Sequence, residues 1–172
     1  MIACRPVRYS KKGIIAATVF ILISPVCMYL SQLDFIAYGV ILQLLGLISL
    51  SIGIYSAIRY SILEFQYMIY DRDGKSDLAI VRIMNERSSE IFRLSFDCYL
   101  EIEEKTKDSV KRIKGKHGKI SRRMNYRVNL DPKKAYIAVF KLNEEICTVE
   151  FEPDSVFIRE MELRKKTEKD DI

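Results

Sequence analysis

Two uncharged apolar stretches near the start of the chain decide its fold: GIIAATVFILISPVCMYL at residues 13–30 and FIAYGVILQLLGLISLSIGIYSAI at residues 35–58. At about 1.5 Å per residue they would be about 27 and 36 Å long as helices, enough to cross a hydrocarbon core of about 30 Å. A chain of 172 residues could hardly bury two helices that are apolar all round. The sequence therefore predicts a transmembrane hairpin with spans at 13–31 and 35–58.

The charges around the spans predict their orientation. Basic residues precede the first span and follow the second, whereas the turn between the spans carries only the charged residue Asp34. The basic residues are Arg5, Arg8, Lys11 and Lys12 before the first span and Arg59 after the second. Basic flanks stay in the cytoplasm, so we expect a cell-membrane protein that crosses twice and has both termini in the cytoplasm. Residues 1–12 would form a basic cytosolic N-terminus. A cleaved secretory signal is the alternative, although Ser24-Pro25-Val26-Cys27 fits a cleavage site poorly.

Small residues recur every seven positions in both spans. Facing residues of an antiparallel hairpin have position numbers with a constant sum, and the pairs 17/53, 24/46 and 31/39 share one sum. Small residues let helix backbones approach closely, which drives helix association in lipid. The predicted helix-packing residues are Ala17, Ser24 and Ser31 in the first span and Gly39, Gly46 and Gly53 in the second. We expect Gln43, which is strongly polar, to bond to a neighbouring helix or a second copy of the chain.

From residue 64 the apolar pattern changes from helical to alternating, which predicts strands. Strand patterns cover 64–70, 78–84, 91–103, 125–130, 135–142 and 147–151, with turns at 71–74, 85–89, 131–134 and 143–145. The alternation over 91–103 never breaks, so we favour one continuous strand bent near Ser95 to Asp97 over two strands. An amphipathic helix should begin with Pro153 at its first position and end near Lys166. A frayed tail at 167–172 should follow it.

This order of about seven short antiparallel strands and one helix, joined by Phe151-Glu152-Pro153-Asp154, resembles the pleckstrin-homology-like (PH-like) fold. With the hairpin in front, the chain resembles small bacterial two-span membrane proteins that carry a PH-like cytosolic domain. The resemblance implies a mainly-β domain at 59–166, in which two orthogonal sheets form an open barrel. The last helix would plug one end with Phe157, Ile158 and Met161. Domains of this fold bind lipids, peptides or proteins, so the fold alone does not choose a function.

Positive charge is concentrated between Lys105 and Arg123, which we predict to be a mobile basic loop. This segment has a net charge of +8, whereas the whole chain has +5. Beside an inner leaflet, each Lys or Arg near the headgroups contributes about 1 kcal/mol. The predicted lipid-contacting residues are Lys111, Arg112, Lys114, Lys116, Lys119, Arg122 and Arg123. A solvated loop without a partner is the alternative. Binding of nucleic acid by the basic loop is a distant alternative, because no set of base-stacking aromatic residues accompanies the charges.

Catalysis has little support in the residue pattern. The sequence contains no Gly-rich phosphate loop, no zinc-ligand spacing and no Ser or Cys beside a plausible base. The lone histidine, His117, falls in the basic loop, where we expect it to be solvated. Carboxylates on outward strand faces should pair with lysines across the strands; these are Glu101, Glu103, Glu150 and Glu152. We therefore expect a non-catalytic protein without cofactor or metal, and reduced thiols at Cys4, Cys27, Cys98 and Cys147.

These patterns together predict a membrane-anchored PH-like module. It would bind an unidentified protein partner at the inner membrane face while its basic loop contacts anionic lipid. The alternative is an accessory subunit of a larger membrane complex, or a homo-oligomer, assembled through the transmembrane hairpin.

Overall fold

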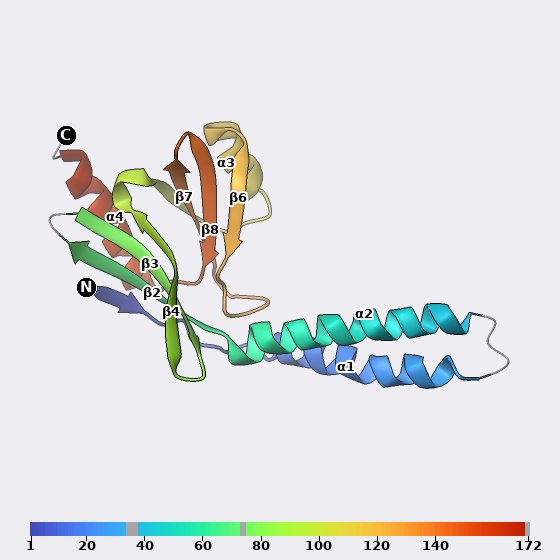
Figure 1. The fold of residues 1–172 in the computed structure, drawn as a ribbon. Coiled ribbons are helices and arrows are strands. Elements are labelled where there is room, and N and C mark those ends of the chain that lie inside the picture. Colours follow the sequence, from blue (N-terminus) through green and yellow to red (C-terminus); the bar gives the residue numbers. More distant parts are fainter. Residues whose placement is uncertain (34–37, 73–74, 171–172) are drawn as a thin grey trace. The chain divides into compact units, whose positions relative to one another are not determined.

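The structure is a computed structural model that describes residues 1–33, 38–72 and 75–170. The chain divides into two compact units (Figure 1). The β unit comprises Met1–Arg8, Glu64–Val128 and Pro132–Ile172, and the hairpin unit comprises Tyr9–Leu63 and Asn129–Asp131. Each unit is described separately.

Two apolar helices make up the hairpin unit, α1 (Lys12–Leu30) and α2 (Gly39–Ala57), and α2 continues through a π-helical turn, η1 (Ile58–Ile62). Both are long and apolar enough to cross a membrane. Their apolar side chains point outward: Leu22 is 62% exposed and Val40 is 71% exposed. An exposed apolar surface of this extent suits lipid better than water. The first helix lies within one residue of the predicted span, whereas the predicted start of the second, Phe35, lies outside the described residues.

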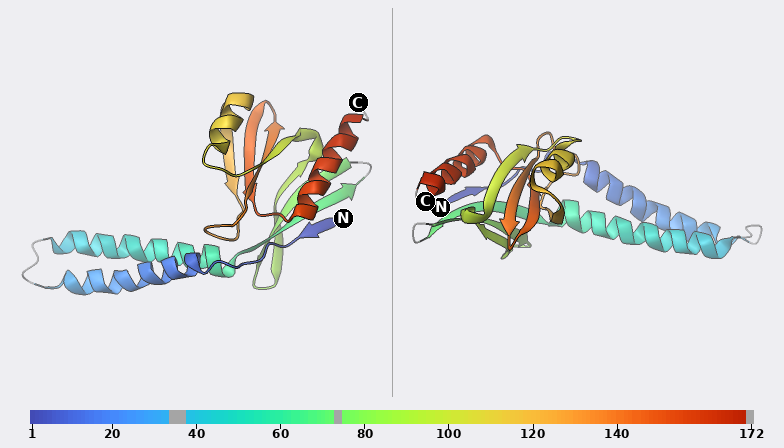
Figure 2. Two further views of the ribbon diagram at one scale, coloured as in Figure 1. Left: turned by 180° about the vertical axis from the view of Figure 1, so that it is seen from behind. Right: turned by 90° about the horizontal axis from the view of Figure 1, so that it is seen from above.

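Eight strands in the described part of the β unit form two four-stranded sheets, which do not close into a barrel there (Figure 2). Sheet A has the order β1-β2-β3-β4, with β1 (Ile2–Cys4), β2 (Glu64–Arg72), β3 (Lys75–Met84) and β4 (Arg87–Ser95). Sheet B has the order β5-β7-β8-β6, with β5 (Tyr99–Glu104), β6 (Ile120–Asn125), β7 (Tyr136–Leu142) and β8 (Glu145–Phe151). The remaining elements are η2 (Phe96–Cys98), α3 (Ser109–His117) and α4 (Ser155–Asp170).

Aromatic side chains from both sheets form the main core, and α4 adds two residues to it. Phe157 and Met161 of α4 are 1% and 0% exposed, whereas Ile158 is half-buried. Tyr67, at the centre, packs edge-on against Phe151 with ring centroids 5.2 Å apart. The mainly-β domain with a C-terminal helix is therefore present as predicted.

The start and the end of α4 differ from the prediction. Asp154 Oδ1 accepts a hydrogen bond of 2.7 Å from the backbone N–H of Phe157, so Asp154 caps the helix and Pro153 lies before the cap. The helix extends to Asp170, so the first four residues of the predicted frayed tail are helical. Residues 171–172 lie outside the described part of the chain.

The first eight residues, Met1–Arg8, belong to the β unit, which the prediction of a basic N-terminus at 1–12 did not include. Residues Ile2–Cys4 pair antiparallel with β2, where Cys4 lies opposite Tyr67. Cys4 is only 5% exposed and belongs to the main core. Backbone pairing and the burial of Cys4 therefore attach β1 to the sheet. With three residues, β1 is too short to show an alternating strand pattern.

The continuous strand predicted over 91–103 is wrong, although the bend lies where we expected it. β4 and β5 belong to different sheets, and η2 separates them. Ser95 Oγ accepts a hydrogen bond of 3.3 Å from the backbone N–H of Asp97, and the side chain of Phe96 is buried at 2% exposure. The local turn and the burial of Phe96 separate the two strands, while apolar and polar residues continue to alternate along the sequence. The alternation therefore did not reveal the break.

The strand predicted at 125–130 is also misplaced, because β6 lies at 120–125. It pairs parallel with β8, so the domain is not entirely antiparallel. Val128 is buried, and the ring of Tyr126 packs edge-on against Phe65 at 5.7 Å. The alternation there reflects burial of side chains from an irregular segment. Of the turn predicted at 71–74, residues 71 and 72 belong to β2, and residues 73–74 lie outside the described part of the chain.

Candidate functional site

The predicted basic loop at 105–123 is an ordered helix and strand, α3 and β6, which corrects the prediction. Ile113 of α3 is 1% exposed and packs in a small core with Ile137, Val139 and Ile146 of sheet B. Gly115 lies inside the helix, and Gly118, with φ of 89°, ends it. The spacing of Val110 and Ile113, three residues apart on one helix face, is the sequence signal that we missed.

Ion pairs attach α3 to β5. Arg112 pairs with Glu103, Lys116 pairs with Glu101, and His117 Nε2 lies 2.8 Å from Glu101 Oε1. Burial raises the pKa of Glu101, but hydrogen bonds from Lys116 and His117 outweigh it, so that the net pKa is below its ordinary value. The carboxylate is therefore held in its charged form, and His117, at 17% exposure, is not a solvated loop residue.

The other predicted carboxylates also have specific positions. Glu150 pairs with Lys105, and it lies 3.4 Å from Arg127 Nε. Glu152 is buried at 8% exposure, so it does not lie on an outward strand face. Glu101, Glu103 and Glu150 thus form ion pairs with residues that follow β5 in the sequence.

All seven predicted lipid-contacting residues are exposed, but Arg112 and Lys116 are held in ion pairs with β5, which leaves five. We call them the α3–β6 cations: Lys111, Lys114, Lys119, Arg122 and Arg123, all of them exposed. Lys111 Nζ lies 3.8 Å from Asp108 Oδ1, and the other four have no carboxylate within 4 Å in the described part of the chain. The elements that carry them, α3 and β6, lie side by side (Figures 1 and 2). β6 is an edge strand, where charged side chains also oppose pairing with another sheet.

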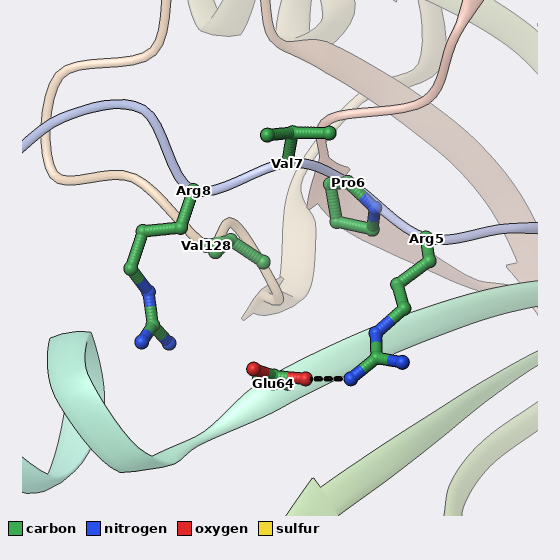
Figure 3. Close-up of a pocket in the computed structure, with 6 residues that line it drawn as sticks. All are labelled: Arg5, Pro6, Val7, Arg8, Glu64 and Val128. Atoms are coloured by element: carbon green, nitrogen blue, oxygen red, sulfur yellow. Dashed lines mark hydrogen bonds and ion pairs between the residues drawn. The ribbon is translucent and has the colours of Figure 1, made fainter.

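A pocket of about 290 Å³ lies between the segment that follows β1 and the start of β2 (Figure 3). Its lining residues are Arg5, Pro6, Val7, Arg8, Glu64 and Val128. Arg5 forms an ion pair with Glu64, and the side chain of Arg8 lies on the other side of that carboxylate. The ion pair fastens the N-terminal segment to β2, and sequence reasoning missed this contact because 59 positions separate the two residues.

The structure brings the six predicted helix-packing residues together in the predicted pairs. A Cβ atom added to Gly53 would lie 3.3 Å from the carbonyl oxygen of Ala17. At Gly46 and Gly39 it would lie 3.2 and 2.8 Å from the carbonyl oxygens of Ser24 and Ser31. Ser49 Oγ donates a hydrogen bond of 2.8 Å to the carbonyl oxygen of Phe20, which sequence reasoning missed although Ser49 follows Gly46 by one helical turn. The close approach of the two backbones is therefore possible only with small residues on this face.

A short segment from outside the hairpin sequence completes the hairpin unit. Asn129 Oδ1 accepts hydrogen bonds of 3.2 and 3.1 Å from the backbone N–H groups of Tyr9 and Ser10, and Asp131 pairs with Lys12. These contacts hold residues 129–131 at the start of α1. Nothing in the sequence pattern predicted them.

No group of three or more His, Cys, Asp or Glu side chains that could hold a metal ion occurs in the described part of the chain. The absence of a cofactor and of catalysis stays a prediction. The described thiols are free, with Cys4 and Cys147 buried and Cys27 and Cys98 half-buried.

A comparison with protein-family models matches residues 7–168 to the family described as Bacterial PH-like domain (DUF6106). Searches of curated proteins and of solved structures returned no match. The family match covers both apolar helices and nearly all of the β unit, and it confirms the resemblance inferred from the order of strands and helix. The chain therefore belongs to the bacterial PH-like domain family.

Proposed function

We propose that the protein is a non-catalytic, membrane-anchored PH-like module. In this proposal α1 and α2 cross the cell membrane with both termini in the cytoplasm. The β unit binds a protein partner at the inner face, and the α3–β6 cations contact anionic lipid. The observation that carries the lipid contact is the set of exposed cations on a helix and strand that ion pairs and a buried isoleucine hold in place.

The magnitude of the lipid contact follows from the number of exposed cations. Each Lys or Arg that reaches an anionic surface contributes about 1 kcal/mol, so all five together would contribute about 5 kcal/mol at most. A domain tethered by a membrane hairpin is already at high effective concentration near the lipid, so even two or three contacts would bias its orientation. The cations would orient the tethered domain and would not recruit it from solution.

The binding of a protein partner is supported by the free edge of sheet A. β4 forms this edge, and its first four side chains, at residues 87–90, are exposed. An edge strand with unpaired backbone groups can accept an extended segment of another protein as an additional strand. An oriented domain would present this edge to partners at the membrane surface.

The lipid contact is tested by fluorescence quenching on the full chain in vesicles. A fluorophore is attached at Ser121→Cys, in a chain that also carries Cys27→Ser and Cys98→Ser, and the lipid headgroups carry the quencher. We expect quenching in anionic vesicles at low salt and its loss at high salt, because salt screens surface charges. Quenching should also be lost when the five α3–β6 cations are replaced by Gln.

The matched control removes exposed positive charge elsewhere on the β unit, by Arg87→Gln, Lys141→Gln and Arg159→Gln. This variant should be quenched like the parent chain. Equal quenching in neutral and anionic vesicles, or equal loss in both variants, would contradict the proposed lipid contact.

A further inference from the structure

Gln43 is a polar side chain in an otherwise apolar part of the hairpin surface. It lies on α2, is exposed, and has no hydrogen-bond partner among the described residues. Several hydroxyl groups of the hairpin behave differently. Thr18, Ser49 and Ser51 each donate a hydrogen bond to a backbone carbonyl oxygen within the hairpin. The Gln43 amide, with two N–H donors and a carbonyl acceptor, is therefore left for a partner outside the chain.

The position of Gln43 along α2 makes this amide costly in lipid. It lies about 6 Å along the helix axis from Gly39, the first residue of α2. In the proposed anchoring this position is inside the hydrocarbon core, where no water is present to bond the amide. A polar group at such a depth is stabilised by a hydrogen bond to a neighbouring helix.

The residues around Gln43 form a stripe with the spacing of a helix-pairing seam. Val40, Leu47 and Ile54 recur every seven residues and are 71%, 50% and 48% exposed. Gln43 and Leu50 lie three residues after the first two, which completes the alternating three- and four-residue spacing of a left-handed helix pair. Each residue of the seven-residue series directly follows one of the glycines that pack against α1. Val40, Leu47 and Ile54 therefore lie about 100° around α2 from these glycines, and Gln43, three residues before Gly46, lies about 60° from Gly46 on the same side.

We propose that two copies of the chain associate side by side through this stripe of α2, with the two Gln43 amides hydrogen-bonded to each other. The inference rests on the proposed membrane anchoring. Two copies with the same topology place Gln43 at the same depth, and an amide is complementary to itself as donor and acceptor. A different partner would need its own polar group at that depth. One polar residue in an otherwise apolar seam also fixes the register of the pair.

The test measures energy transfer between full-length chains that carry donor or acceptor fluorophores at the C-terminus. The vesicles consist of neutral phosphatidylcholine, so that contacts of the α3–β6 cations with anionic lipid do not contribute. Transfer should rise with the protein-to-lipid ratio, and Gln43→Leu should weaken dimerisation about 3- to 30-fold. Gln43→Asn, which keeps the amide, should recover part of the loss. Ser51→Ala is the matched control on the same helix, because its hydroxyl is already bonded to Leu47, and it should leave dimerisation unchanged.

Two results would overturn the inference: no transfer at any protein-to-lipid ratio, or equal dimerisation of the parent chain and Gln43→Leu. Alkaline carbonate extraction of the same vesicles separates this failure from failure of the anchoring. A chain that resists extraction but does not dimerise overturns only the inference. A chain that is extracted refutes the anchoring and the inference with it.

Discussion

Tyr67 is fully buried, yet its hydroxyl has two hydrogen-bond partners from distant parts of the β unit. It donates to the backbone oxygen of Tyr126 at 2.8 Å and accepts from the backbone N–H of Glu152 at 3.2 Å. These bonds connect sheet A with the segment after β6 and with the junction between β8 and α4. The bond to Tyr126 holds in place the irregular segment after β6, for which the sequence pattern had predicted a strand.

Replacing Tyr67 by Phe should lower the free energy of unfolding by about 1–3 kcal/mol, because both hydrogen bonds are lost inside the core. Urea unfolding of the full chain in detergent, followed by the β-sheet circular-dichroism signal, measures the change. Tyr99→Phe is the control: Tyr99 is also buried, at 6% exposure, and its hydroxyl has no hydrogen bond in the described part of the chain. Equal effects of the two substitutions would contradict the role given to the Tyr67 hydroxyl.

The ion pairs of Glu101 predict a pH dependence of the attachment of α3. The folded-state pKa of Glu101 is below its ordinary value of 4.5, so its contribution to stability is present above pH 4.5 and lost as the pH falls through the folded pKa. Glu101→Gln should therefore destabilise the chain at neutral pH, and the difference from the parent chain should shrink on acidification below 4.5. Unfolding measurements from about pH 7 to pH 3 check this expectation. Glu86→Gln, at an exposed turn, should show no such trend, and a constant difference for Glu101→Gln would count against the ion pairs.

Replacing a glycine by alanine should have opposite effects on stability in two of the helices, α2 and α3. A Cβ on Gly53 would lie 2.7 Å from Ile21 Cγ1 and 3.0 Å from the backbone nitrogen of Ile21, whereas a Cβ on Gly115 would meet nothing within 4 Å. Gly53→Ala should therefore loosen the hairpin, and Gly115→Ala should stabilise α3 by about 0.5–1 kcal/mol through its better helix propensity.

Thermal unfolding in detergent, followed by helical circular dichroism, separates the two glycine variants. The midpoint should fall for Gly53→Ala and rise for Gly115→Ala. A fall of similar size in both variants would mean that loss of glycine, and not the contact with Ile21, determines the result.

The elements differ in how well the sequence predicted them, for physical reasons. The spans and their pairing follow from local periodicity, since small residues every seven positions can face only one neighbour in a hairpin. The tight turns at Asn85-Glu86 and Asn143-Glu144 follow from turn chemistry, and all four residues have positive φ. α3 was missed because its lysines and Gly115 obscure its one fully buried apolar residue, Ile113. The candidate cations were found from charge alone, but which of them are tied in ion pairs depends on tertiary packing.

At the scale of the whole molecule, the β unit contains residues from both sides of the hairpin sequence. The residues of β1 lie more than 50 positions before the strand they pair with, so no local pattern could reveal this contact. The parallel pairing of β6 with β8 could not be predicted either, because it depends on the connection from β6 to β7, which passes β8, and not on strand periodicity. A fragment that starts after the hairpin would lack β1, so binding experiments require the full chain.

The reactivity of the thiols tests the place of β1 in the full chain. Burial raises the pKa of Cys4 to about 11, and the nearby negative charge of Asp154 also favours the protonated thiol. At pH 8 only about one Cys4 thiol in a thousand would be ionised. Cys98, which is half-buried, should therefore be alkylated in the native protein, whereas Cys4 should react only after denaturation. Mass spectrometry of the alkylated peptides measures the alkylation rates. Equal rates for the two thiols in the native protein would contradict the placement of β1 in sheet A.

The most direct test of the account is the sidedness of the hairpin in intact bacterial cells. Two single substitutions in a Cys27→Ser and Cys98→Ser chain supply the probes, Gln32→Cys after α1 and Ser121→Cys in β6, both at exposed positions. A membrane-impermeant maleimide should label Gln32→Cys from outside and should label Ser121→Cys only after the cells are opened. Labelling of both from outside, or of neither until the cells are opened, would contradict a two-span anchor with a cytoplasmic PH-like domain.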